Sequence, residues 1–181
     1  MEYKIAWFTE GGWQGKVPRD HPNMRNDMAW MHTLDVVHYP IPMASQITEK
    51  FDIGIVTLPK THIDKLIQLD TMKEIKRVCK RLGTMQEGPH WYFQDYTMEQ
   101  QIWFYNILSE LDFIWCHNEI DKKYYRGLTN KKCYVNPTLM IEDNIKPYLE
   151  YEQKNTLFNL DNRIMDIGVE PSNDIVIDFD V

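Results

Sequence analysis

Acidic, imidazole and amide side chains recur in this sequence at the ends of short apolar segments. His90 follows Glu87 after one such segment, and His117 follows another, with Asn118 and Glu119 directly behind it. An imidazole with carboxylates nearby can act as a general base on a hydroxyl group, so His90, Glu87 and His117 are the candidate catalytic residues. Asn118 and Glu119 are candidate substrate-binding residues. They can instead cap the helix that follows, which would make His117 structural.

Aromatic side chains surround the first of these histidines. Trp91, Tyr92 and Phe93 directly follow His90, and Asp95 lies just beyond them. Aromatic faces stack on sugar rings or bases, so Trp91 and Asp95 are candidate substrate-binding residues. The alternative interpretation of His90 is a histidine that anchors its loop over packed aromatic rings.

A glycine-rich loop follows the first apolar segment of the chain. It does not fit a P-loop, because its first glycine is too close to Gly15-Lys16 and because Val17 stands where Ser or Thr would bind Mg²⁺. It also lacks the GxGxxG pattern of dinucleotide-binding proteins, which disfavours a small nucleotide-binding regulator. A tight turn that lets a ligand approach the backbone is the better interpretation. The candidate substrate-binding residues of this loop are Glu10, Gly11, Gly12 and Trp13.

Metal and nucleophile motifs are missing from the sequence. No HxxxH, HExxH, paired CxxC or GxSxG spacing occurs, so we expect no metal site, no intrinsic cofactor and no α/β-hydrolase. Cys79, Cys116 and Cys133 are scattered and are interpreted as reduced core thiols of a cytoplasmic protein. No apolar run is long enough to span a membrane, and the first residues form no signal peptide.

The charge balance bears on the class of partner. The chain has 20 Lys and Arg against 27 Asp and Glu, a net charge of −7, which argues against a protein that wraps nucleic acid by charge alone. Two basic clusters are interpreted as solvated helix faces, with phosphate or nucleic-acid contact as the alternative. The first comprises Lys73, Lys76, Arg77, Lys80 and Arg81, and the second Lys122, Lys123, Arg126, Lys131 and Lys132.

Short apolar segments alternate with helical periodicities, which indicates βαβ units and an α/β, Rossmann-like, mostly parallel sheet flanked by helices. Ligands of such sheets bind beyond the carboxyl ends of the strands, where the candidate residues above fall. The expected strands are Tyr3–Phe8, Val36–Ile41, Phe51–Leu58, Thr84–Gln86, Phe113–Cys116 and Cys133–Val135. The expected helices include one capped by Asn23, then Ile63–Leu69, Thr71–Leu82, a helix from Thr97 to about Leu111, and Asp121–Leu128.

Capping boxes of Thr71 with Glu74 and of Thr97 with Gln100 support two of these helices. The alternation of apolar segments with helical periodicity ends after Pro147. We therefore expect a Rossmann-like domain over residues 1–147 and a short C-terminal extension over residues 148–181. This extension ends in a half-exposed edge strand, because apolar and acidic residues alternate over Asp174–Val181.

Several of these segments resemble the start of phage-type glycosyltransferases with the GT-B fold. The resemblance covers residues 1–147 and is carried by Lys4–Trp13, Gly15–Asp20, Met85–Trp91, Cys116–Glu119 and Asn136–Asp143. It implies transfer of a sugar from a nucleotide-sugar to an acceptor, with the N-terminal domain of the family mainly holding the acceptor. The Gly11-Gly12 loop, the His90 loop, His117 and Glu119 would then line the acceptor side, and Arg19 is a further candidate substrate-binding residue.

The length departs from this family, whose enzymes use two Rossmann-like domains. The donor site is therefore expected to be absent or to belong to a partner chain, with a nucleotide-sugar as donor if the protein is active. The acceptor would be a sugar, a polysaccharide or a nucleic acid, and the setting the host cytoplasm if the chain is phage-encoded. The alternative is a non-catalytic binding module or subunit that uses the same cleft.

Overall fold

The computed structural model describes residues 3–18, 21, 26–58, 67–86, 90–93, 95–139 and 141. They belong to the first of two compact units of the chain, residues 1–141 and 142–181. The expected edge strand Asp174–Val181 and the expected helix Ile63–Leu69 fall mostly or wholly outside the described residues. The strands are β1 (Ile5–Thr9), β2 (Val37–Pro40), β3 (Phe51–Leu58), β4 (Cys79–Gln86), β5 (Phe113–Cys116) and β6 (Lys132–Val135).

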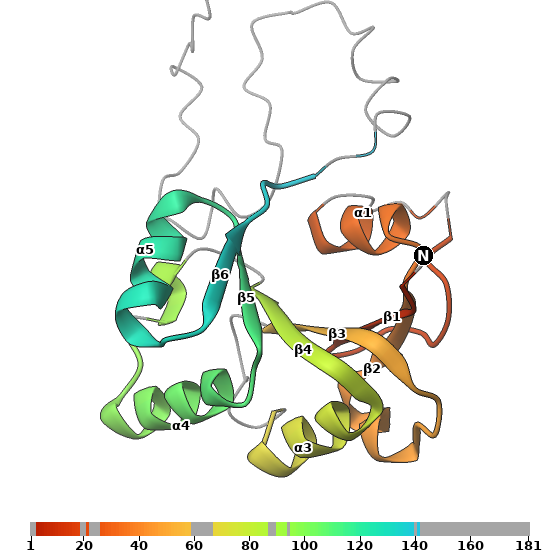
Figure 1. Ribbon diagram of the computed structural model, residues 1–181, viewed down its shortest axis with the longest axis horizontal. Helices are drawn as coiled ribbons and strands as arrows, with labels where there is room; N and C mark the ends of the chain where they lie inside the picture. Colours follow the sequence, from red (N-terminus) through yellow and green to blue (C-terminus); the bar gives the residue numbers. More distant parts are fainter. Residues whose placement is uncertain are drawn as a thin grey trace, which may run out of the picture. The chain divides into compact units, whose positions relative to one another are not determined.

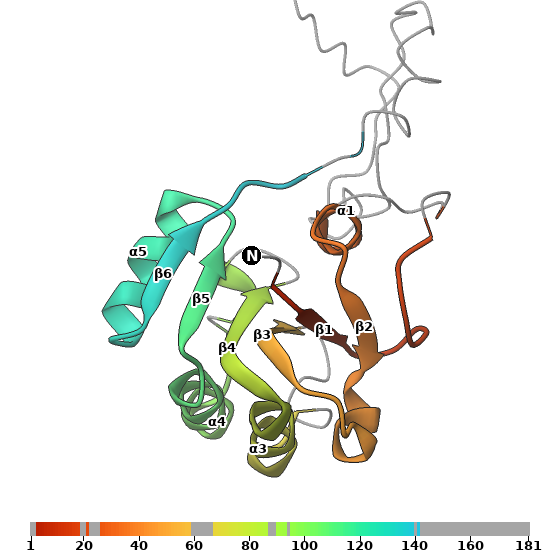
Figure 2. The ribbon, with the colours of Figure 1, turned by 45° about the vertical axis from the view of Figure 1, so that its right-hand side comes forward.

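These strands form one sheet in the order β2-β1-β3-β4-β5-β6, and every pair of neighbours is parallel. The arrowheads of β4, β5 and β6 point toward the same edge of the sheet (Figure 2). The arrangement confirms the predicted α/β Rossmann-like fold. The chain moves from β1 outward to β2 and then returns to β3 on the other side, so the switch point of the topology lies between β1 and β3.

Helices cover both faces of the sheet, as Figure 1 shows with α1 on one side and α3 and α4 on the other. The apolar residues of α3, α4 and α5 share one core with strand residues such as Phe8, Val56 and Ile114. A second core lies under α1, which buries Met28 and Met31. The helices are α1 (Asn26–Thr33), α3 (Leu69–Val78), α4 (Met98–Ser109), α5 (Glu119–Leu128) and the short 3-10 helices η1 (Ile41–Gln46) and η2 (His90–Phe93).

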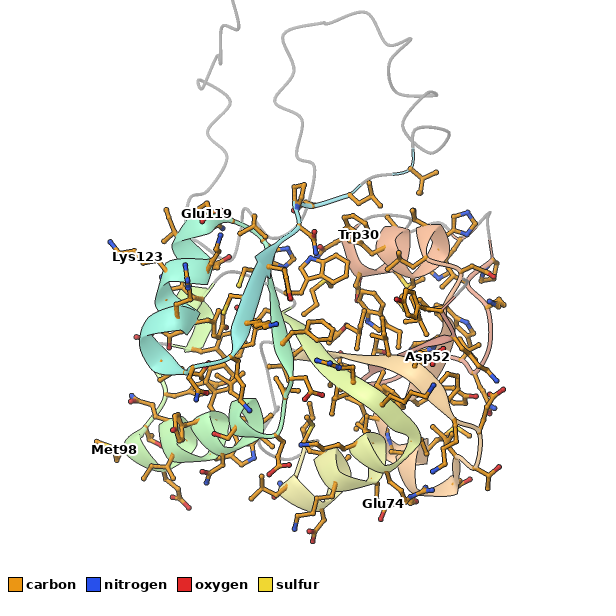
Figure 3. The ribbon with its side chains drawn as sticks, viewed as in Figure 1. Trp30, Asp52, Glu74, Met98, Glu119 and Lys123 are labelled. Atoms are coloured by element: carbon orange, nitrogen blue, oxygen red, sulfur yellow. The ribbon has the colours of Figure 1, made fainter. Side chains whose placement is uncertain are left out.

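Three tryptophans dominate the core under α1. Trp115 packs edge-on against Trp7, with ring centroids 5.8 Å apart, and against Trp30, at 4.8 Å. Trp30, labelled in Figure 3, comes from α1. The buried Trp7 indole N–H donates to Thr57 Oγ1 over 2.7 Å. The indole donor is therefore paired, although it lies in an apolar layer.

The boundary between α3 and β4 differs from the predicted one. The periodicity of Ile75, Val78, Cys79 and Leu82 predicted a helix as far as Leu82, but Cys79 has extended backbone angles (φ −118°, ψ 136°) and opens the strand. Leu82 is nevertheless buried, because alternation along a strand places it inward just as helical spacing would. Gly83, expected to stop the helix, lies within β4.

The capping boxes had opposite outcomes. The box of Thr97 and Gln100 is confirmed at the start of α4, where Gln100 N–H donates to Thr97 Oγ1 and Thr97 N–H donates to Gln100 Oε1. The box of Thr71 and Glu74 is wrong, because Gln68 precedes the first turn of α3 and Thr71 lies inside it.

Helical periodicity predicts that Ile102, Tyr105, Leu108 and Leu111 form the inward face of α4, which is correct only in part. Leu108 and Leu111 are buried, but Ile102 and Tyr105 are 55% and 49% exposed, and Phe104 and Ile107 are buried in their place. The ring of Phe104 stacks on that of Phe93 at 4.8 Å, and this contact with η2 sets which side of α4 faces the core. The predicted strands Phe51–Leu58 and Phe113–Cys116 have the bounds expected, and the other strands and α5 differ from prediction at their ends.

Candidate functional site

The carboxyl ends of β4 and β5 position the best-developed polar site. Gln86 is the last residue of β4 and Cys116 the last of β5, and the two strands are parallel neighbours. His90 starts η2 after β4, and Asn118 caps α5 after β5. Two loops from adjacent strands therefore bring their polar residues to the same edge of the sheet, as the fold class predicts.

Asp121 is the centre of this site. Its carboxylate is only 1% exposed and accepts three hydrogen bonds. Oδ1 accepts from the backbone N–H of His90 at 3.0 Å and from His90 Nδ1 at 2.7 Å, and Oδ2 accepts from Asn118 Nδ2 at 2.9 Å. Its position in the first turn of α5 adds the favourable field of the helix N-terminus.

The contact with Asp121 fixes the tautomer and the orientation of His90. A carboxylate only accepts, so Nδ1 carries the proton and Nε2 is the basic nitrogen of the neutral ring. The His90 ring is stacked on Tyr124 with centroids 4.9 Å apart, and 13% of its side chain is exposed. A histidine held from behind by a buried carboxylate is the arrangement that general bases use.

His117 is bound differently from His90. Its Nε2 donates to the backbone carbonyl of Gln86 at 2.7 Å, which leaves Nδ1 as an acceptor in the neutral ring. This buried Nδ1 has no hydrogen-bond partner among the residues that the structure describes. Burial raises the pKa of Tyr125 well above its usual value of 10.0, so its hydroxyl remains protonated at neutral pH.

An unpartnered buried nitrogen such as His117 Nδ1 is unusual in a protein core, where most polar atoms are paired. Gln86 lies between His117 and Tyr125. Its carbonyl accepts from His117 Nε2, and its side chain hydrogen-bonds with Tyr125, which opposes the rise in the pKa of that hydroxyl. Beyond the general base, the site therefore holds one unpaired acceptor nitrogen.

The glycine loop after β1 forms a second, separately braced group. Gly12 and Gly15 have φ values of 101° and 122°, in the region that favours glycine. Trp13 packs on His38 with ring centroids 4.7 Å apart, and its carbonyl accepts a hydrogen bond from His38 Nδ1. Thr9 Oγ1 lies 2.7 Å from His38 Nε2 and 2.8 Å from the carbonyl of Gly11.

His38 is not among the predicted site residues, yet its contacts hold this loop on the sheet. It is 1% exposed, and desolvation by burial lowers its pKa from the usual 6.5, while the Trp13 carbonyl opposes that shift. The loop residues Glu10 and Gly11 are exposed. Ligand binding at this loop stays a prediction.

The two groups lie at the same edge of the sheet but are not joined. β3 separates β1 from β4, so the ends of β1 and β4 lie roughly 10 Å apart. No hydrogen bond, ion pair or ring contact between residues described in the structure connects the glycine loop with the His90–Asp121 pair. A common cleft for both loops, which the resemblance implies, stays a prediction.

The remaining predicted site residues occupy varied positions. Asn118 is the N-cap of α5, where Oδ1 accepts from Asp121 N–H at 2.8 Å, and it also braces Asp121. Glu119 is exposed, points outward from α5 and pairs with Lys122 at 3.1 Å (Figure 3). Asp95 is exposed. Arg19, Glu87 and the side chain of Trp91 lie outside the described residues.

Sequence reasoning missed Asp121, Tyr124 and the side-chain role of Gln86. It named Glu119 as the carboxylate near His117, whereas the carboxylate that contacts a histidine is Asp121. The sequence signal for Asp121 is the spacing Asn118-x-x-Asp121. At a helix start with this spacing, the side chain of the fourth residue reaches back to the N-cap residue. Its pairing with His90, distant in sequence, depends on tertiary structure.

The cysteines and the other classes of site can be described briefly. Cys79, Cys116 and Cys133 are unpaired thiols, and burial raises the pKa of Cys79 and of Cys116 to about 12, which disfavours a nucleophilic role. Within the part of the chain that the structure describes, no three His, Cys, Asp or Glu side chains gather as a metal site would require. No helix among the described residues has the length and apolarity needed to cross a membrane.

Comparison with family models, with curated proteins and with solved structures found no match to this chain. The site itself presents a histidine oriented by a buried carboxylate at the ligand-binding edge of a parallel sheet.

Proposed function

We propose that this chain is the acceptor-side half of a glycosyltransferase with the GT-B fold, and that His90 is its general base. The observation that supports this most is the Asp121 carboxylate, buried and bound to His90 Nδ1 at 2.7 Å. The parallel sheet, with the pair at its carboxyl edge, is the setting in which such folds bind ligands. The resemblance of residues 1–147 to phage-type enzymes names sugar transfer as the reaction.

In the proposed reaction, the acceptor hydroxyl gives its proton to His90 Nε2. The acceptor oxygen forms a bond to the anomeric carbon of the donor sugar as the bond from that carbon to the nucleoside diphosphate breaks, and the diphosphate leaves with the electron pair. Asp121 stabilises the imidazolium that forms, since its charge lies against the second ring nitrogen. His117 Nδ1 would accept from another hydroxyl group of the acceptor.

The nucleotide-sugar itself would be held elsewhere. Residues 3–141 provide one Rossmann-like sheet, and the GT-B fold uses two. The donor-binding sheet would then be contributed by another domain or by a partner chain. The glycine loop at β1 would border the same acceptor, with Gly11 offering exposed backbone.

A non-catalytic binding subunit is the second candidate. The unpartnered His117 Nδ1 favours it equally, because it is a binding group and needs no proton transfer. The two candidates differ in the role of His90: a base affects turnover, whereas a binding module needs only the shape and polarity of the site.

A thermal-shift titration with two panels of ligands tests the proposal. One panel contains nucleotide-sugars and the other contains oligosaccharides and glucosylated or hydroxymethylated nucleosides as acceptor mimics. A ligand that binds only the folded chain raises its stability by about 2.7 kcal/mol at one hundred times Kd. A shift with an acceptor mimic, and none with any nucleotide-sugar, is the expected result. A shift with a nucleotide-sugar would contradict the acceptor-half assignment, and no shift in either panel would count against a sugar site.

A further inference from the structure

The two basic clusters of the chain differ in how their charges are neutralised. On α3 and the start of β4, four cations each pair with a carboxylate: Lys73 with Asp70, Lys76 with Glu110, Arg77 with Glu74 and Lys80 with Asp52, at 2.6–3.4 Å. Arg81, the fifth cation of the cluster, forms no ion pair with a described residue. The four paired cations make this cluster a solvated, salt-bridged face, as predicted.

The cluster on α5 and β6 is different. Among the described residues, only Lys122 has a carboxylate partner, and that partner, Glu119, is itself 74% exposed. Lys131 Nζ donates to the carbonyl of Ser109 and keeps its charge uncompensated. Arg126 and Lys132 form no ion pair with any residue that the structure describes. In a chain with a net charge of −7, this is a local concentration of positive charge.

These cations line a hollow of about 500 Å³ where the end of α5 meets the edge strand β6. Lys122 and Arg126 come from one side of α5, Lys131 and Lys132 from the turn into β6, and Asn130 adds a polar group. Small-ligand sites span roughly 300–1,000 Å³, so the hollow has room for a nucleotide unit. The negative end of the α5 dipole accounts for one nearby cation but not for four.

An aromatic side chain borders the same hollow. Tyr134 of β6 is 51% exposed, and its ring rests edge-on against Phe113 with centroids 6.2 Å apart. Cations that follow a phosphate backbone beside an aromatic face that stacks on bases are the combination by which proteins hold single-stranded nucleic acid.

We propose that this basic pocket of α5 and β6 binds single-stranded nucleic acid, with Arg126, Lys131 and Lys132 on the phosphates and Tyr134 stacked on a base. The site is distinct from the His90–Asp121 pair and does not depend on sugar transfer. A duplex fits less well, since its stacked bases cannot reach Tyr134.

Fluorescence anisotropy of a labelled dT12 oligonucleotide with the full chain tests this. For three phosphate contacts, affinity should fall roughly 20-fold between about 50 and 200 mM salt, from a slope of about −0.7 per contact. The double variant Arg126→Gln/Lys132→Gln should weaken binding at least tenfold. Its matched control, Lys73→Gln/Lys76→Gln, removes the same charge from the paired cluster and should change binding less than twofold.

Further measurements distinguish binding of nucleic acid from binding of other polyanions. Tyr134→Ala should weaken dT12 at least fivefold, and Tyr134→Phe should preserve binding, because stacking needs the ring and not the hydroxyl. Absence of dT12 binding at low salt would overturn the proposal. An equal loss of dT12 affinity in both double variants would overturn it too. The same holds if heparin or phosphatidylserine vesicles bind more tightly than dT12 and Tyr134→Ala has no effect on binding.

Discussion

Asp121 Oδ1 receives two hydrogen bonds from His90, one from the backbone N–H at 3.0 Å and one from ring Nδ1 at 2.7 Å. One carboxylate oxygen thereby fixes both the start of η2 and the orientation of the imidazole. Because the second oxygen is bound to Asn118, the carboxylate cannot rotate without losing a partner. The pair is thus a rigid unit that links the loops after β4 and β5.

Replacing Asp121 by Asn should therefore destabilise the protein. An amide has one oxygen and one NH₂ group, so either the two His90 donors or Asn118 Nδ2 would face another donor. Leaving such groups unsatisfied in the interior costs about 1–3 kcal/mol. Urea unfolding of Asp121→Asn measures the loss. The exposed neighbour Glu119 provides the control, since Glu119→Gln should change stability by no more than about 0.5 kcal/mol.

The pH dependence of stability should contain a contribution from His38. Burial lowers the pKa of His38 from 6.5, so as the pH falls below 6.5 the unfolded chain takes up a proton that the folded state resists. The contribution of His38 to stability is fully present above pH 6.5 and decreases as the pH falls through 6.5 toward the lowered value. Melting temperatures between about pH 8 and 5.5 should fall less steeply for His38→Gln than for the wild type. The same slope in both, with His32→Gln as the comparison, would refute this role.

Gly83 should be required by the ring of Phe113. The two residues are register partners across β4 and β5, and a Cβ on Gly83 would lie 2.1 Å from Phe113 Cε2. Gly83→Ala should destabilise the protein by about 1–3 kcal/mol through overpacking. In a double-mutant cycle, Phe113→Leu should recover part of this loss. If the effects of the two substitutions on stability are purely additive, the Phe113 ring is not what requires glycine at position 83.

Two threonines with the same sequence pattern should differ in their effect on stability. Thr97 caps α4 and accepts from Gln100 N–H, so Thr97→Ala should cost about 1 kcal/mol. Thr71 has the same spacing to Glu74 but lies inside α3, so Thr71→Ala should cost clearly less. Guanidinium unfolding of both variants checks the difference, and equal losses would mean that the Thr97 cap contributes nothing of its own.

The fold class and most strands could be predicted from the sequence because buried parallel strands give short apolar segments at regular intervals. The α3–β4 boundary could not, since Cys79 and Leu82 satisfy a helical and a strand pattern alike. In the site, the topology identified the edge at which His90 and His117 lie. It could not identify Asp121, because its pairing with His90 depends on how α5 packs beside η2, and a local pattern shows only the cap formed by Asn118.

The most direct test of the central claim is long-range ¹H–¹⁵N NMR of the histidine rings during a saccharide titration. The account predicts that His90 is protonated on Nδ1, and that a bound acceptor saccharide shifts its Nε2 resonance while the resonances of His32 stay in place. Protonation of His90 on Nε2, or a bound saccharide that leaves His90 unshifted, would contradict its role as the base that receives the acceptor proton.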